Sequence, residues 1–209
     1  MFDLEGQLPA DWLDEARQRL RDGGENALRV LFPGLARSVG RDALDGGIQE
    51  REGLKVNFAA WRVCDAAGSA LIEAAETSDE TIVDLFLHGD FEERTIVMRS
   101  LAVADVGPAT VELLGEAQRT NTQTHFEACV CDSNLVARAV GQRDFKTNDA
   151  YKTLLKGAFV GLPLDRFFGI LDHASPELAR MVEGLASERR AAGRAVWPDT
   201  DRVVAACGS

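Results

Sequence analysis

Apolar residues recur along this chain at the three- and four-residue spacing that places them on one face of an α-helix. Tyr151, Leu154, Leu155, Ala158 and Phe159 follow this spacing. Two further stripes follow it, the second less purely: Leu178, Met181, Val182, Leu185 and Ala186, and Phe126, Cys129, Val130, Ser133 and Ala137. Signals for β-strands are scarce, since no run of residues alternates clearly between apolar and polar. The sequence therefore predicts an all-α fold.

Helix start and stop signals divide the chain into short helices. Capping-box spacing occurs at Thr77 with Glu80, at Asp90 with Glu93, and at Thr124 with Glu127. The predicted helices cover residues 9–22, 26–32, 35–44, 54–76, 79–88, 91–104, 108–121, 125–140, 147–160, 176–192 and 199–206. A shorter element is expected around 164–170, and loops are expected at 23–24, 45–47 and 141–146.

The spacing of these helices indicates how they pack. Between residues 77 and 140 a helix begins about every 13 to 18 residues, and the connections are tight turns. Short connections force neighbouring helices to run antiparallel. We therefore expect one domain over residues 1–209, built of stacked antiparallel helical hairpins as an irregular HEAT-like α-solenoid. A closed helical bundle is the alternative.

Charge and hydropathy exclude several classes of partner. The chain has 34 acidic and 23 basic residues, a net charge of −11, and 45% hydrophobic residues. An acidic chain is a poor candidate for binding nucleic acid or an anionic membrane through electrostatics alone. No window approaches the roughly 20 apolar residues of a membrane helix, and the acidic segment at residues 1–5 does not resemble a secretory signal. We expect a cytoplasmic protein that neither inserts in membranes nor binds nucleic acid.

No catalytic, metal-binding or cofactor-binding motif is present in the sequence. The glycines at 46 and 47 have no predicted strand before them, as a phosphate-binding loop would need. His88, His125 and His173 are isolated from one another, and no Ser lies in a GxSxG motif. Cys129 lies on an apolar stripe, which predicts a buried and inert thiol. The prediction is no catalytic residues, no metal and no cofactor.

Polar residues within the apolar helices of the C-terminal half are the candidates for binding a ligand. They are Asn134, Lys156, Arg166, Asp172, Glu188 and Arg189. Burying a charge is costly unless it is paired, so these residues form either ion pairs between neighbouring helices or a polar pocket for an anionic or polar ligand. The basic residues Arg180, Arg189, Arg190 and Arg194 form either a solvated helix face or a contact for carboxylate or phosphate.

Three segments of the C-terminal half together carry a family resemblance. They are Leu154–Arg166, which reads LLKGAFVGLPLDR, Pro176–Arg180, which reads PELAR, and Ala186–Arg194, which reads ASERRAAGR. They resemble the EboA family, and Thr124–Ala128, Asn134, Phe32–Gly40 and, more loosely, Trp61–Ala75 also fit its pattern. The chain departs from that pattern at Ala150-Tyr151, where the family favours Trp-Asn. It departs again at Arg190, where an aromatic is usual, and after Pro198, where the family has a Trp.

The resemblance implies a part in making or exporting a secondary metabolite, and it carries over no catalytic residue. The favoured hypothesis is a non-catalytic helical-repeat protein that binds a small metabolite or a partner protein of that pathway. The second hypothesis is an enzyme in which Lys156 binds an anionic group and Glu188 or Asp172 acts as acid or base. The third is a purely structural subunit, such as a homodimer, with a large exposed apolar patch.

Overall fold

The computed structural model describes residues 2–208, and it confirms a predominantly helical fold: 65% of the chain is helical, and the only sheet in the described residues has two strands. The α-helices are α1 (Ala10–Leu31), α2 (Leu35–Ser38), α3 (Val63–Ala74), α4 (Asp79–His88), α5 (Phe91–Ser100), α6 (Pro108–Arg119), α7 (Gln123–Val130), α8 (Leu135–Ala139), α9 (Thr147–Val160), α10 (Pro176–Ala191) and α11 (Thr200–Cys207). Short 3-10 helices lie at η1 (Glu5–Gln7), η2 (Phe58–Ala60), η3 (Leu164–Arg166) and η4 (Ile170–His173). The strands are β1 (Ile48–Arg51) and β2 (Leu54–Asn57).

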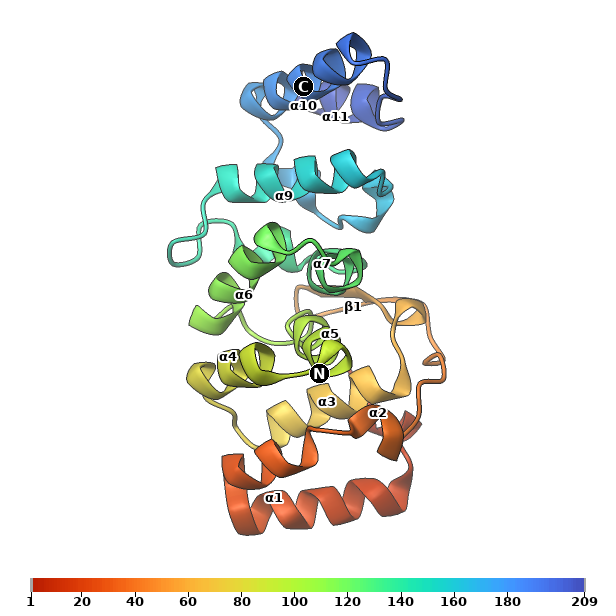
Figure 1. Cartoon of the computed structure of the whole chain (residues 1–209), viewed down its shortest axis with the longest axis vertical. Coiled ribbons are helices and arrows are strands. Elements are labelled where there is room, and N and C mark those ends of the chain that lie inside the picture. Colours follow the sequence, from red (N-terminus) through yellow and green to blue (C-terminus); the bar gives the residue numbers. More distant parts are fainter. Residues whose placement is uncertain (1, 209) are drawn as a thin grey trace.

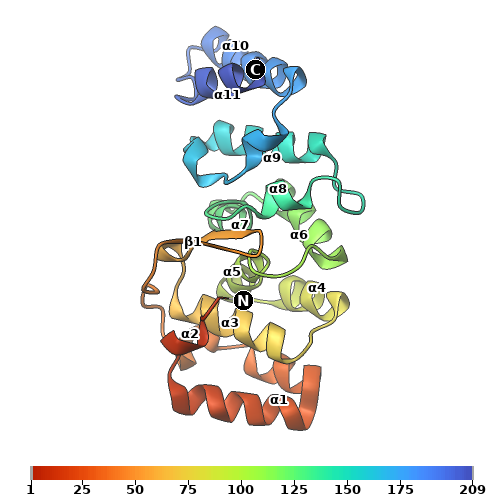
Figure 2. The ribbon, with the colours of Figure 1, turned by 180° about the vertical axis from the view of Figure 1, so that it is seen from behind.

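The helices are stacked along the long axis of the molecule in nearly the order in which they follow one another in the chain. Figure 1 shows α1 at one end, α3 to α7 in the middle, and α9 to α11 at the other end. Neighbouring layers supply most of the packing, because α5 packs on α3, α4 and α7, and α10 packs on α11 and α9. The view from behind, in Figure 2, shows the same order. The repeat character of this stack stays a prediction.

Several predicted boundaries are confirmed, and two predicted caps are wrong. Gly24 has a φ of 52° and breaks α1 where the sequence predicts a loop. The capping box at the start of α5 is present, since Glu93 N donates to Asp90 Oδ1 and Asp90 N donates to Glu93 Oε2, both at 2.9 Å. The helix predicted over 79–88 has Ser78 as its cap, and not Thr77. α7 begins at Gln123 and not after Thr124.

The second strand of a β-hairpin, β2, and the short helix η2 replace the first part of the helix predicted over 54–76. β1 and β2 pair antiparallel with Arg51 opposite Leu54, so the turn consists of Glu52 and Gly53 alone. Both turn residues have positive φ, at 53° and 80°, as a type I′ hairpin turn requires. The helix predicted over 35–44 is also shorter than expected, because α2 ends at Ser38.

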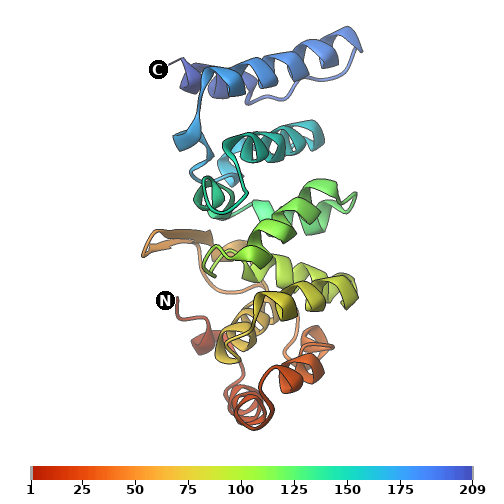
Figure 3. The same ribbon diagram turned by 90° about the vertical axis from the view of Figure 1, so that its left-hand side faces the viewer.

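The helix predicted over 125–140 is interrupted, and the hairpin docks at the interruption. α7 ends at Val130 and α8 begins at Leu135, while Asp132 between them has a φ of 59°. Single β-bridges join Val56 to Ser133 and Ser133 to Phe167. Figure 3 shows the hairpin, in orange, projecting from one side of the stack. The interruption therefore holds a strand pair against the side of an otherwise helical protein.

Candidate functional site

Lys156 caps the end of a neighbouring helix. Its Nζ donates to Ala117 O at 2.8 Å, Gln118 O at 3.0 Å and Thr120 O at 2.6 Å, which are carbonyls at the C-terminus of α6. The same ammonium lies 4.7 Å from the ring centroid of Phe126. Burial lowers the pKa of Lys156, and the three carbonyls satisfy all three of its donors. These contacts favour a structural role for the side chain.

Arg166 forms ion pairs with Asp132 and Glu127. Its Nη2 lies 2.6 Å from Asp132 Oδ2, and its Nη1 lies 2.6 Å from Glu127 Oε2. Asp132 N also donates to Arg166 O at 2.7 Å. Burial alone would lower the pKa of Arg166, but the hydrogen bonds of Asp132 and Glu127 raise it. Arg166 thus fixes the bend between α7 and α8.

The three remaining charged candidates lie apart from Lys156. Asp172 and Glu188 are exposed, and Arg189 is half-buried. Arg189 Nε donates to Ala195 O at 2.5 Å, and its guanidinium lies 5.6 Å from the ring centroid of Phe159. The hydrogen bonds and ion pairs of these side chains do not bring Lys156 and a carboxylate together, as the enzyme hypothesis requires. Ligand binding by these candidates stays a prediction.

Asn134 holds the β-hairpin in place. Its Oδ1 accepts a hydrogen bond from Lys55 N at 3.0 Å, and its Nδ2 donates to Gly53 O at 2.8 Å. Its own backbone N donates to Lys55 O at 2.9 Å. Asn134 therefore satisfies the outer backbone groups of β2 and fixes the hairpin turn against the start of α8.

Sequence reasoning missed a network of charges buried in the middle of the stack. Arg62 Nη2 lies 2.9 Å from Asp65 Oδ1, whose side chain is fully buried, and Arg62 Nη1 lies 2.6 Å from Glu92 Oε2. Arg99 Nε lies 3.7 Å from Asp65 Oδ2, and its Nη1 donates to Ala60 O. Burial alone would lower the pKa of Arg62, but Asp65 and Glu92 raise it. The network joins α3 to α5 as closed ion pairs.

Cys129 is buried, as the sequence predicts, and so are Cys64 and Cys131. Burial raises the pKa of Cys64 to about 11 and that of Cys131 to about 12, and it raises the pKa of Cys129 as well. In residues 2–208, no group of three or more His, Cys, Asp or Glu side chains is arranged to hold a metal ion. Within the same range, no helix combines the length and apolar character needed to cross a membrane.

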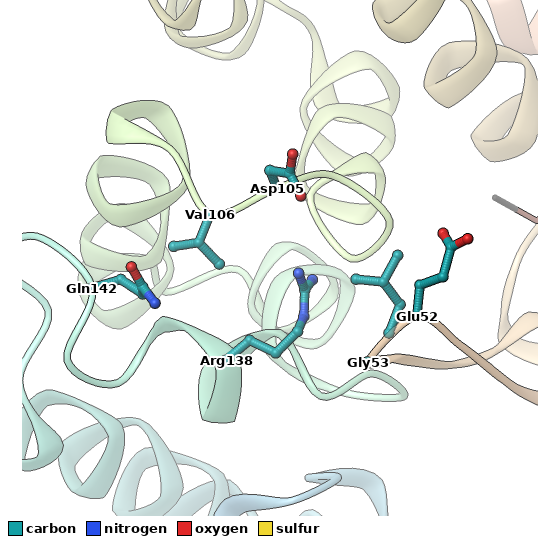
Figure 4. A pocket seen from close by; sticks show the side chains of 7 residues that line it. Glu52, Gly53, Asp105, Val106, Arg138 and Gln142 are labelled. Carbon is teal, nitrogen blue, oxygen red and sulfur yellow. The ribbon is translucent and has the colours of Figure 1, made fainter.

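A cleft lies between the hairpin turn and α8. Its volume is about 510 Å³, within the range of small-molecule sites. Figure 4 shows Gln142 and Glu52 on opposite sides of this cleft, with Arg138 pointing into it from α8. The lining residues are Glu52, Gly53, Leu54, Asp105, Val106, Arg138 and Gln142. Three separate segments meet here: the hairpin, the loop between α5 and α6, and α8 with the residues that follow it.

Arg138 is the positively charged residue of the cleft lining. Its Nη1 donates to Ala104 O at 3.1 Å, and its Nη2 donates to Ala102 O at 2.9 Å. Its Nε is buried and has no hydrogen-bond partner in the described part of the chain. Burial lowers the pKa of Arg138, and the charge of Asp105 opposes that effect. The two carbonyls hold the guanidinium in place at the cleft.

One signal in the sequence points to this site. Glu52-Gly53 is a turn signal like Asn-Gly, because glycine supplies the positive φ that such turns need. Asn134 is the predicted candidate that is connected to the cleft, through its bond to Gly53. Arg138, which was not among the predicted candidates, follows Asn134 by one helical turn. The approach of Asp105 and Gln142 depends on tertiary packing.

One comparison with known proteins gives a match. The family model described as "Metabolite traffic protein EboA" matches residues 6–205, nearly the whole chain. No curated protein and no solved structure matches the chain.

Proposed function

The chain belongs to the EboA family, and we propose that it is a non-catalytic protein that binds a small metabolite in the cleft between the β-hairpin and α8. The cleft is the observation that carries the proposal. It is large enough for a small molecule, and polar and aliphatic side chains from three segments converge on it. The family description, a metabolite traffic protein, fits binding without conversion.

The contacts of Lys156 support a binding protein over an enzyme. The enzyme hypothesis needs a free lysine and a carboxylate around one open cavity. All three donors of Lys156 are bonded to carbonyls of α6, and Glu188 is exposed on α10. The cleft contains a guanidinium, two carboxylates and an amide, which suit hydrogen bonding and charge recognition.

Native mass spectrometry tests the proposal. The wild-type chain and two variants are incubated with a small-molecule extract of the source cells and then desalted. Gln142→Trp fills the cleft from an exposed position, and Asp144→Trp places the same ring on an exposed residue of the same loop, outside the lining. We expect a bound small molecule on the wild type and on Asp144→Trp, and none on Gln142→Trp.

Two outcomes contradict the proposal. Retention of the molecule by Gln142→Trp at the wild-type level would place binding outside the cleft. Conversion of the molecule into a product, abolished by Lys156→Ala, would favour the enzyme.

A further inference from the structure

Arg138 differs from two other half-buried arginines of this chain in its electrostatic partners. Arg62 and Arg166, which are also half-buried, each pair with two carboxylates at 2.9 Å or less. Arg138 forms no ion pair with a carboxylate of the described residues, and carbonyl oxygens are its hydrogen-bond partners. Carbonyls stabilise a guanidinium but do not neutralise it, and the charge of Asp105 offsets only part of the effect of burial on Arg138. The cleft therefore has a fixed positive group that an anion would complement.

Carboxylates on the same cleft would repel a simple anion. Asp105 and Glu52 both belong to the lining, and Asp105 is near enough to act on the charge of Arg138. A ligand with only negative charge meets these carboxylates, and a ligand with only positive charge meets Arg138. From this arrangement, and building on the proposed function, we infer that the cleft selects a small zwitterion. Its carboxylate or phosphate binds Arg138, and its protonated amine faces Asp105.

The remaining lining suits the part of the ligand between its two charges. Leu54 and Val106 are half-buried aliphatic residues of the lining. They offer contact to a short carbon chain. Gln142 adds an amide that both donates and accepts hydrogen bonds. Asn134 fixes the turn that bears Glu52 through its bond to Gly53 O, so the carboxylate side of the cleft is held in position.

Three probes with the same four-carbon chain separate the charge requirements. 4-Aminobutyrate is a zwitterion, succinate has two carboxylates and putrescine has two amines. Titration of the ¹⁵N-labelled full chain by NMR detects binding even at millimolar affinity. We expect 4-aminobutyrate to shift the amide signals of Gly53, Val106 and Arg138 in a saturable manner, and to bind about tenfold or more tightly than either of the others. Phosphoethanolamine then shows whether phosphate or carboxylate is the preferred anion.

Variants assign each charge to its residue. Arg138→Gln removes the positive group. We expect this variant to bind 4-aminobutyrate about tenfold or more weakly than the wild type, and to bind putrescine and 4-aminobutyrate with similar affinity. Arg138→Lys keeps the charge and is expected to restore part of the affinity. This variant separates recognition of charge from loss of the contacts with Ala102 O and Ala104 O. Asp105→Asn is expected to bind 4-aminobutyrate more weakly than the wild type and to bind succinate more tightly. Arg190→Gln removes an arginine of α10 and is the matched control.

The outcomes distinguish this inference from the proposed function. If succinate or putrescine binds as tightly as 4-aminobutyrate, or if no probe shifts the cleft signals, the zwitterion inference is wrong. The proposed function still stands in either case if a metabolite is retained by the wild type and lost by Gln142→Trp. If 4-aminobutyrate is not preferred and Gln142→Trp does not abolish metabolite binding, the inference and the proposed function are both wrong.

Discussion

Long basic side chains in this protein often bind backbone carbonyls instead of carboxylates. Lys156 binds the end of α6, Arg138 binds the residues that follow α5, and Arg94 binds Leu87 O and Gly89 O at the end of α4. The last carbonyls of a helix have no partner within it and carry partial negative charge. A cation from a neighbouring helix supplies both the missing hydrogen-bond donors and a compensating positive charge. Short helices have many such ends, so this contact connects successive layers of the stack.

Lys156 provides a direct test of this role. Lys156→Ala leaves three carbonyls of α6 without their ammonium donor and removes the contact with Phe126. We expect a loss of about 2 kcal/mol in the free energy of unfolding, measured by urea denaturation. Lys152→Ala is the control, because Lys152 is exposed on the same helix and forms a surface ion pair with Asp149, and a loss below about 1 kcal/mol is expected there. Equal losses in the two variants would show that Lys156 is not a cap.

The importance of these polar residues was predictable from the sequence, but their partners were not. Lys156 lies between Leu155 and Gly157 in an apolar segment, and a charge in such a place needs compensation wherever the chain folds. Ion pairing was one of the two expected forms, and Arg166 has that form with Asp132 and Glu127. Lys156 is satisfied by carbonyls some 36 to 39 positions away in the chain. Nothing in the local pattern indicates that distant partner.

At the scale of elements, regular helices were predictable and the irregular connections were not. The apolar stripes of α9 and α10 are confirmed except at Phe159, which is exposed, and Leu154, Leu178 and Val182 lie in the core. The segment 54–57 was expected to be helical, because its apolar residues continue into the clear helical pattern after Trp61. Glu52 adopts a φ of 53° that glutamate rarely takes on its own, so the turn depends on the docking of β2 against Asn134. Tertiary contacts decide such elements.

The joint between α1 and α4 is expected to be sensitive to acid. Glu25 accepts hydrogen bonds from Ser78 N and Thr81 Oγ1, both at 2.6 Å, at the N-terminus of α4. The hydrogen bond from the Ser78 backbone, followed by those from the Thr81 and Ser78 side chains, lowers the pKa of Glu25 from 4.5 to about 2. A carboxylate whose pKa is lower in the folded chain than in the unfolded chain stabilises the fold when the pH is above its unfolded pKa. This contribution disappears as the pH falls toward its folded pKa.

Glu25→Gln tests this link by thermal or urea unfolding between pH 7 and pH 2. We expect the wild type to be more stable than the variant above the unfolded pKa of 4.5, and the difference to shrink steadily as the pH falls to about 2. Glu15→Gln is the control, because Glu15 is an exposed carboxylate of the same helix at 4.0 Å from Arg19. A difference between wild type and Glu25→Gln that does not change with pH would contradict the assignment.

At the scale of the molecule, the order of the stack has consequences for how it opens. Each layer packs mainly on the layers next to it, and the C-terminal pair α10 and α11 has α9 and η4 as its principal neighbours. In such an arrangement, stability is approximately a sum of local terms and nearest-neighbour interfaces. A closed bundle differs, because its helices share one core and lose protection together. The stability of the two ends of the chain therefore distinguishes the two architectures.

Trp197 is the residue through which this difference can be measured. Its side chain is 4% exposed, and its Nε1 donates to Leu162 O at 2.8 Å, which connects the segment before α11 to the end of α9. Trp197→Ala is expected to cost about 3 kcal/mol or more at this interface. Hydrogen exchange should then accelerate throughout α10 and α11 and stay unchanged in α3 and α5, because the layers between them keep their contacts. Equal acceleration in all four helices would identify a single cooperative core and contradict the solenoid.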